Sequence, residues 1–282
     1  MAGPSPLETL DRRWIFATLW VLVMLPLIRP LMLPLVVTPP AKAYYDAVES
    51  IPDGSDVLMP CDYDPGALPE LVPMTKTTLR RLFHKHCKVV VVCLWNGGPG
   101  VVDQAVRGVA EGEFHLKDGV DFVNLGYKAG NESVMVLMGQ GFANAFPVDY
   151  NGRPTHAMPI MKRVRDYSSI VMLIAISAGY PGTKEWVQQV QSRFHVRMVS
   201  GCTAVSAPEY YPYLRSGQLL GLLGGMAGAA EYERQTGLPG PATRGMDAQS
   251  LAHVLVALCI IAGNVVQWRR RGEPPAGGGG PA

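Results

Sequence analysis

The residues best suited to chemistry stand in four polar or glycine-rich stretches, each following an apolar run. Asp62 and Asp64 alternate in CDYDPG, and two carboxylates at this spacing could bind a cation or serve as general acid and base. The same residues beside a proline and a glycine are also ordinary turn chemistry. The two aspartates are therefore candidate pocket residues, with a structural turn as the alternative.

Two of the stretches are loops rich in glycine. Asn96, Gly97 and Gly98 begin NGGPG, where free backbone N–H groups could hold an anion at the start of the next helix. This stretch lacks GxGxxG and the lysine of a phosphate-binding loop, so a tight strand-to-helix turn is the alternative. Ser177 and Thr183 bracket AGYPG, and Ser177 resembles a nucleophile only superficially because GxSxG is absent.

The fourth stretch, GCTAVSAP, adds Thr203 and Ser206 to the candidate pocket residues. Its Cys202 could act as a thiol nucleophile if a histidine lay beside it. The five cysteines show no CxxC spacing, so nothing resembles a metal framework or a dense disulfide scaffold. We therefore expect no metal site and no cofactor.

The elements that must position these stretches alternate between strands and helices. The runs 88–95 and 169–177 are continuous and rich in β-branched residues, which is typical of strands buried on both faces. Further strands and amphipathic helices are expected at 55–60, 75–87, 101–110, 121–127, 183–194 and 196–202. This alternation predicts an α/β fold with a Rossmann-like, open and mostly parallel sheet flanked by helices. Ligands of such sheets bind outside the carboxyl ends of the strands, which nominates the four stretches.

The segment 217–233 has a helical apolar pattern in spite of its glycines. Gly221 with Gly225, and Gly224 with Gly228, form two overlapping GxxxG pairs, whose known use is the close approach of another helix. Tight packing against the sheet or a membrane helix is one explanation. An oligomer interface and a backbone that contacts a ligand are the others. The four glycines are therefore candidate helix-packing residues.

Two apolar segments predict membrane anchors. Residues 251–268 contain no Asp, Glu, Lys or Arg and would span about 27 Å as a helix, close to the hydrocarbon core of about 30 Å. Residues 14–37 form a second apolar segment, whose prolines are tolerated in membrane helices more readily than in soluble ones. A cleaved signal peptide ending in AKA at 41–43 is the alternative for this first segment.

The charges beside the two segments predict their orientation. Arginines precede the first segment and follow the second, so the positive-inside rule puts both termini in the cytoplasm and the main domain outside the inner cell membrane. The predicted order is a cytoplasmic tail at 1–13, a transmembrane anchor at 14–37, an extracytoplasmic α/β domain at 41–236, a linker at 237–249, a transmembrane helix at 250–268, and a basic then disordered cytoplasmic tail at 269–282.

The charge balance narrows the expected partners. The chain has 25 basic and 23 acidic residues, for a formal net charge of +2. The basic residues cluster at the membrane flanks and in short helical patches, so nucleic-acid binding is not expected. The expected partners are the lipid bilayer and either further copies of the chain, as an oligomer, or other membrane proteins.

Four stretches of the sequence resemble a known family. SAGYPGTKEWVQQVQ, GCTAVSAPEYYPYL, SGQLLGLLGGMAGAAEYE and CDYDPGALPEL are similar to segments of an uncharacterised family of prokaryotic membrane-anchored α/β proteins. The resemblance covers roughly residues 15–268, both anchors included. It implies the architecture described above and no established activity, so it assigns no catalytic residue.

Three functions are consistent with the sequence. The first is a membrane-anchored α/β domain without catalysis, acting as a subunit or accessory of a membrane complex in transport or envelope organisation. The second is a membrane-surface hydrolase or transferase that uses the Asp62/Asp64 and Ser177/Thr203 loops. The third is a sensor of a small solute, because aromatic side chains could line a crevice. These aromatic residues are Trp95, Tyr127, Tyr180 and Tyr210.

Overall fold

The computed structural model describes residues 11–271 of the chain. This part divides into two compact units. One unit is Pro34–Thr243, and the other joins the segment up to Leu33 with the segment from Arg244 onward. The predictions for residues 1–10 and 272–282, which belong to the two tails, lie outside the described residues.

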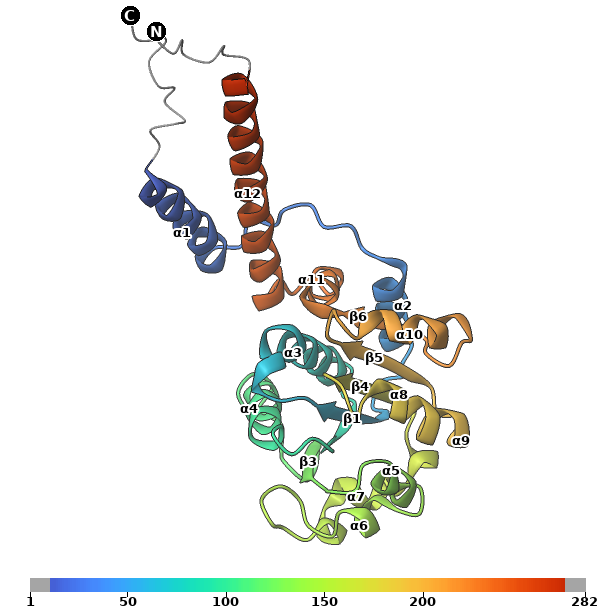
Figure 1. Cartoon of the computed structure of the whole chain (residues 1–282). Helices are drawn as coiled ribbons and strands as arrows, with labels where there is room; N and C mark the ends of the chain where they lie inside the picture. The colour runs from blue at the N-terminus through green and yellow to red at the C-terminus, as the bar shows by residue number, and fades with distance from the viewer. Residues whose placement is uncertain (1–10, 272–282) are drawn as a thin grey trace, which may run out of the picture. The chain divides into compact units, whose positions relative to one another are not determined.

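The larger unit is built on one parallel sheet (Figure 1). Its strands are β1 (Asp56–Asp62), β2 (Lys88–Cys93), β3 (Phe122–Tyr127), β4 (Met172–Ser177), β5 (Met198–Cys202) and β6 (Leu222–Gly224). All pairs are parallel, in the order β3-β2-β1-β4-β5-β6. This is the order of a doubly wound Rossmann-type sheet, with the reversal between β1 and β4. The predicted fold class of this unit is confirmed.

Helices cover both faces of the sheet. They are α2 (Pro39–Glu49), α3 (Leu68–His84), α4 (Pro99–Ala110), α5 (Glu132–Met138), α6 (Phe142–Ala145), α7 (Pro159–Arg163), α8 (Thr183–Trp186), α9 (Ser192–Phe194), α10 (Ala207–Arg215) and α11 (Gly225–Gln235). Helices α3, α4 and α11 pack together on one face. Side chains from α5, α6, α8 and α10 join the core on the other.

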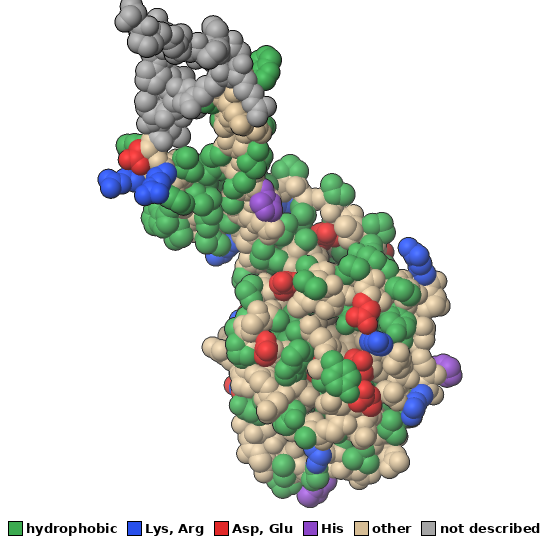
Figure 2. Space-filling model, viewed as in Figure 1, with side chains coloured by type: hydrophobic (Ala, Val, Ile, Leu, Met, Phe, Trp, Pro, Cys, Tyr) green, Lys and Arg blue, Asp and Glu red, His purple; other side chains and the backbone are tan. Residues whose placement is uncertain are grey.

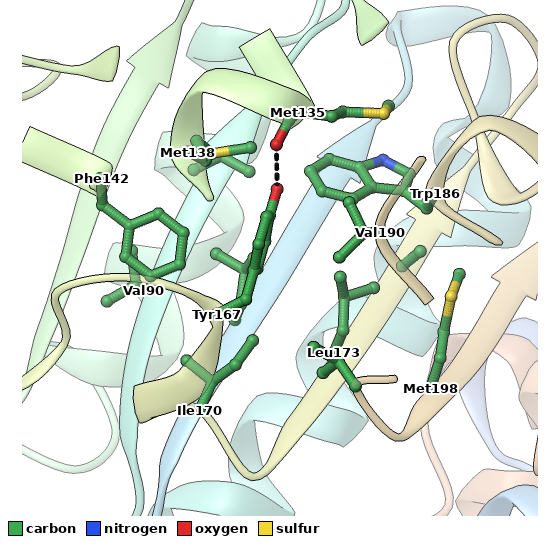
Figure 3. Close-up of a cluster of buried hydrophobic side chains, with 14 of the residues drawn as sticks. Val90, Met135, Met138, Phe142, Tyr167, Ile170, Leu173, Trp186, Val190 and Met198 are labelled. Atoms are coloured by element: carbon green, nitrogen blue, oxygen red, sulfur yellow. Dashed lines mark hydrogen bonds between the residues drawn. The ribbon is translucent and has the colours of Figure 1, made fainter. Parts of the chain in front are cut away.

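The core on the second face is a continuous apolar cluster (Figure 3). Tyr167 is its main polar member, and its hydroxyl donates to the backbone oxygen of Met135 at 2.7 Å (Figure 3). Successive strand residues point to opposite faces, so continuous apolar runs such as Val89–Val92 supply both cores at once. The buried runs predicted as central strands are therefore confirmed as β2 and β4.

One helix begins well before its predicted start. The helix predicted at 75–87 begins at Leu68, because Pro69 falls in the first turn of α3, where a helix needs no N–H from that residue. Pro73 lies inside the helix and lacks one backbone donor there. The prolines suggested a loop, but their positions allow α3 to begin directly after β1.

The glycine-rich segment 217–233 is not one helix. Residues 217–221 are irregular, Leu222–Gly224 form β6, and α11 begins at Gly225, whose φ is +62°. Gly221 lies against the backbone of α2, where an added Cβ would stand 2.2 Å from the nitrogen of Tyr44. A Cβ on Gly228 would meet Leu223 at 3.0 Å. These glycines therefore serve close packing inside the domain.

The smaller unit contains the apolar segments. Helix α1 spans Arg12–Ile28 and α12 spans Pro241–Arg271. Within residues 11–271, one helix, Pro241–Trp268, is long and apolar enough to cross a membrane. The predicted span 14–37 differs from the structure, because its helix ends at Ile28 and non-helical residues follow. The predicted linker 237–249 also differs, since its residues from Pro241 onward are helical.

Two carboxylates fix the segments beside the start of α12. Asp247 accepts hydrogen bonds from the backbone N–H groups of Leu31, Met32 and Leu33 at 2.9, 3.0 and 3.1 Å. At the first turn of α12, the buried Glu233 accepts hydrogen bonds from four donors. These are the N–H groups of Gly240, Ala242 and Thr243 and the hydroxyl of Thr243. An acidic side chain is favourable here because it meets unpaired N–H groups and the positive end of the helix dipole.

Candidate functional site

The carboxyl edge of the sheet is where the sequence places its candidates. Asp62 and Ser177 are register partners at the ends of β1 and β4, and the N–H of Ala178 donates to the backbone oxygen of Asp62 at 3.0 Å. Ser177 is paired in turn with Cys202 at the end of β5. NGGPG follows β2, the other neighbour of β1. The structure thus brings all four predicted stretches to the ends of adjacent strands, across the reversal between β1 and β4.

Asp62 is fully buried and both of its carboxyl oxygens are occupied. Oδ1 accepts from the N–H of Leu94 at 2.6 Å, and Oδ2 accepts from Nε1 of Trp186 at 2.7 Å. Burial raises the pKa of Asp62 to about 7, against the lowering effect of these two donors. The side chain ties β1 to β2 and α8, which leaves it no free oxygen for a ligand in this geometry.

Trp186, the last residue of α8, packs at the reversal of strand order between β1 and β4. Its ring is buried in the apolar cluster, and its indole nitrogen lies on the side away from Tyr167 (Figure 3). Helix α8 is held there because Glu185 accepts from the N–H of Gly182 at 2.8 Å. Doubly wound domains bind ligands in the crevice at this reversal. In this protein, the side chains of Trp186 and Asp62 occupy the place of that crevice, because a hydrogen bond joins them across it.

Ser177 lies in a chain of buried hydroxyl groups. Its Oγ lies 2.9 Å from Oγ1 of Thr183 and accepts from the Thr183 N–H at 3.0 Å. Oγ1 of Thr183 lies 2.5 Å from Oγ of Ser200, which donates to the backbone oxygen of Ala175 at 3.0 Å. A serine nucleophile needs a base beside it. This chain ends on a carbonyl group, so it joins β4, α8 and β5 without activating Ser177.

The accessible surface of this edge carries acidic side chains. Asp64 accepts from the N–H of Gly66 at 2.9 Å and begins the turn that leads into α3. Asp64 also lies beside NGGPG, the stretch after β2, where a Cβ on Gly97 would be 3.3 Å from the Cβ of Asp64. Glu70 accepts from the N–H of Ala204 at 2.8 Å and joins the first turn of α3 to the loop after β5. A phosphate at the start of α3 would meet two carboxylates, which disfavours a nucleotide.

The remaining candidates serve local turns. The hydroxyl groups of Thr203 and Ser206 lie 3.0 Å apart before α10. Gly98 packs tightly, since a Cβ there would stand 2.5 Å from the backbone oxygen of Tyr63, and its neighbour Asn96 is exposed. Burial raises the pKa of the Cys202 thiol to about 12, which disfavours a thiolate nucleophile. Within residues 11–271, no three His, Cys, Asp or Glu side chains gather as a metal site would require.

A cavity of about 380 Å³ lies beyond the predicted site, at the carboxyl end of the edge strand β3. None of the nine candidate pocket residues lines it. Its lining comes from the start of α4, the end of β3 and the loop after α6. The lining residues are Pro99, Leu125, Gly126, Tyr127, Lys128, Ala145, Phe146, Pro147, Val148, Asp149 and Tyr150.

The loop that forms the outer wall of this cavity is firmly held. Asp149 accepts from the Arg153 guanidinium at 2.8 and 2.5 Å and from the N–H of Asn151 at 3.0 Å. Arg153 also pairs with Asp118 at 2.7 Å. The N–H of Tyr150 donates to the backbone oxygen of Asn124 in β3 at 3.0 Å. The cavity is therefore preformed by bonds that link residues far apart in the chain.

Gly126 allows the loop to approach β3. Its φ is +77°, and a Cβ there would lie 3.2 to 3.4 Å from three atoms of Tyr150. The sequence signal for this cavity was Tyr127, the last residue of a strand, followed directly by Lys128. Of the four aromatic residues predicted to line a crevice, Tyr127 alone is among the residues that line this cavity.

Comparisons with known proteins give no relative. No family model, no curated protein and no solved structure matches the chain.

Proposed function

We propose that the protein is a membrane-anchored α/β domain that serves, without catalysis, as an accessory subunit of a membrane complex in transport or envelope organisation. The observation that carries the proposal is the exposed apolar surface of α12. The segment Pro241–Trp268 has a mean hydropathy of 1.9 over its most apolar window, and none of that window is buried. Apolar surface left in water costs about 25 cal/mol per Å². A bilayer removes that cost.

Helix α1 supports a second membrane segment that is shorter than the predicted one. Hydrophobic side chains cover the visible face of α1 and much of α12 (Figure 2). Phe16 and Leu19 of α1 line a groove with Val256 and Cys259 of α12, whereas the residues after α1 bond to Asp247, near the other end of the apolar stretch. The two helices therefore run antiparallel. With 17 residues, α1 is about 25 Å long, just under the thickness of the hydrocarbon core.

The antiparallel pair also supports the predicted orientation. Arg12 and Arg13 begin α1, and three arginines end α12, so an antiparallel pair carries both basic flanks on one side of the bilayer. The positive-inside rule makes that side the cytoplasm. The α/β domain then lies outside the inner membrane.

The site geometry favours a role without catalysis over a hydrolase or transferase. Asp62 has both oxygens engaged in packing, and the hydroxyl of Ser177 contacts another hydroxyl rather than a base. Asp64 completes the turn before α3. Thr203 likewise bonds to Ser206 within its own turn. The groups that the enzyme hypothesis requires are thus engaged in bonds that hold the fold and its turns.

Membrane extraction tests the anchor. The full chain should remain in the membrane pellet after alkaline carbonate washing, whereas a chain of residues 34–245 should move to the supernatant, because it retains the cap at Glu233 and loses both α1 and the apolar part of α12. A chain ending at Arg271 is the matched control and should stay in the pellet. In digitonin, the full chain should migrate on a blue-native gel well above one chain with its detergent.

Two results would refute this function. If the full chain is extracted by carbonate, the membrane anchor is wrong. If it is retained but migrates as a single chain, the anchor stands and the role as a subunit of a complex is wrong. Variants of Gly225 are unsuitable for this test, since a Cβ there would stand 2.6 Å from Ala204 and disturb the domain itself.

Cysteine labelling tests the orientation. Val205 is 91% exposed on the domain, and the native cysteines of the domain are buried, so a membrane-impermeant maleimide should label Val205→Cys in intact cells. Ser5→Cys, in the N-terminal tail, should react only after permeabilisation. The reverse pattern would place the domain in the cytoplasm.

A further inference from the structure

We propose that the cavity beside β3 binds a small organic carboxylate with an aromatic or branched apolar body. This site is distinct from the reversal between β1 and β4, and the proposal does not depend on the membrane anchor. A volume of about 380 Å³ lies within the range of about 300 to 1,000 Å³ of small-molecule sites. The shape, lining and charge of the cavity each support the assignment.

The interior of the cavity is apolar. Leu125, Ala145 and Phe146 are buried in the core and form its inner wall, while Pro99 and Pro147 add apolar surface at the sides. An aromatic or branched hydrocarbon group fits such a wall, because its burial removes apolar surface from water on both molecules. A sugar or another highly hydroxylated solute would leave its polar groups unpaired here.

The rim of the cavity is polar and carries a positive charge. Lys128 lies on the rim, and its ammonium group makes no ion pair within the described part of the chain. The one acidic residue of the lining, Asp149, is neutralised by its two bonds to Arg153. The net charge presented to a ligand is therefore positive, which favours a carboxylate over an amine.

The cavity is also rigid enough to select a ligand. Tyr127 and Tyr150 stand on its rim, half exposed, and the backbone of Tyr150 is bonded to β3. The ionic bonds of Asp149 and Arg153 fix the loop between them. A preformed wall reduces the ordering cost of binding. A small ligand can therefore gain measurable affinity from a few contacts.

Calorimetric titration of the full chain in phosphatidylcholine nanodiscs tests the proposal. Phenylacetate is the probe, and phenylacetamide is its uncharged match. Phenylacetate should bind saturably and at least about tenfold more tightly than the amide, since a charge-assisted hydrogen bond is worth a factor of about ten or more. Lys128→Met should abolish this tenfold preference, and Lys162→Met, on the exposed face of α7, should preserve it.

A second variant tests the location of the site. Val148 is 49% exposed on the rim, so Val148→Trp should fill the cavity without disturbing the core, and it should remove binding of both compounds. Circular dichroism would verify its fold. Three outcomes would overturn the proposal: no saturable binding of phenylacetate up to about 10 mM, equal affinities for acid and amide, or unchanged binding by the folded Val148→Trp variant.

Discussion

Asp62→Asn should lower the free energy of unfolding by about 3 kcal/mol at pH 4, because the substitution sets a donor against a donor inside the core. A carboxyl group keeps a lone pair on each oxygen whether it is charged or protonated. An amide nitrogen has none. It would face either the N–H of Leu94 or Nε1 of Trp186, at distances of 2.6 and 2.7 Å in the native protein. Urea unfolding followed by tryptophan fluorescence measures the loss.

The same substitution should change the pH dependence of stability. The folded-state pKa of Asp62, about 7, lies above the unfolded value of about 3.9, so the folded state holds the proton more tightly. The contribution of Asp62 to the free energy of unfolding is therefore complete below about pH 4 and is lost as the pH rises through about 7. Three pKa units correspond to about 4 kcal/mol. Between pH 4 and pH 8 the stability advantage of the wild type over Asp62→Asn, about 3 kcal/mol at pH 4, should therefore disappear or reverse in sign.

Two comparisons isolate Asp62 from other groups. Arg80 lowers the pKa of Glu113 through a hydrogen bond, so the contribution of Glu113 to the stability of the fold is lost as the pH falls. This loss is the same in the wild type and in Asp62→Asn. Asp64→Asn is the matched control and should keep the wild-type pH profile. Trp186→Phe removes one of the two opposed donors, so in the double variant the loss should be smaller than the sum of the single losses. A pH-independent difference between wild type and Asp62→Asn would contradict the assignment.

Glu233→Ala should release the start of α12. The substitution leaves four donors from Gly240, Ala242 and Thr243 without an acceptor in a buried site, at a cost of about 1 to 3 kcal/mol for each that water cannot reach. We expect a total loss of about 4 kcal/mol, most of it local. Hydrogen exchange at the amides of Ala242 and Thr243 should accelerate at least about a hundredfold, as a loss of about 3 kcal/mol implies.

A surface glutamate provides the control for Glu233. Glu209 lies on α10, with a side chain 56% exposed, and its contact with Lys184 is 3.5 Å long. Glu209→Ala should change stability by less than about 0.5 kcal/mol, because exposed ion pairs contribute little. If exchange near Thr243 is equally fast in both variants, Glu233 does not cap α12.

The sheet could be predicted because its strands are marked by composition. The β-branched runs at 88–95 and 169–177 became β2 and β4, and the weaker runs around them became β1, β3 and β5. A strand buried on both faces needs apolar residues at every position, which is a local signal. The turns between strands and helices also carry local signals, so these strands end close to their predicted positions.

The role of the candidate residues could not be predicted in the same way. Asp62 looked like a loop residue, but it is the last residue of β1, and its role depends on Trp186, 124 positions away in the chain. The cavity beside β3 depends likewise on the bond from Tyr150 to Asn124 and on the pairing of Arg153 with Asp118. Such partners are set by tertiary folding. The sequence around each residue does not reveal them.

The glycine-rich segment shows the limit of a periodic pattern. Gly221 and Gly225 have the spacing of a helix-packing motif, yet Gly221 precedes a strand and Gly225 opens a helix with a positive φ. Their common requirement is the absence of a Cβ, against α2 in one case and against Ala204 in the other. The spacing of glycines thus predicted close contact but not the element that makes it.

The two borders of the sheet determine how the domain can meet other proteins. An unpaired border strand is a template on which a foreign strand can add, leading to aggregation. Here β6 has only three residues, and the N–H of Tyr150 already occupies a carbonyl group of β3 at the opposite border. Each border therefore offers an incoming strand few free backbone groups with which to form hydrogen bonds. A partner would have to recognise side chains on the helices and loops, and copies of the domain can lie close together with little tendency to form cross-strand assemblies.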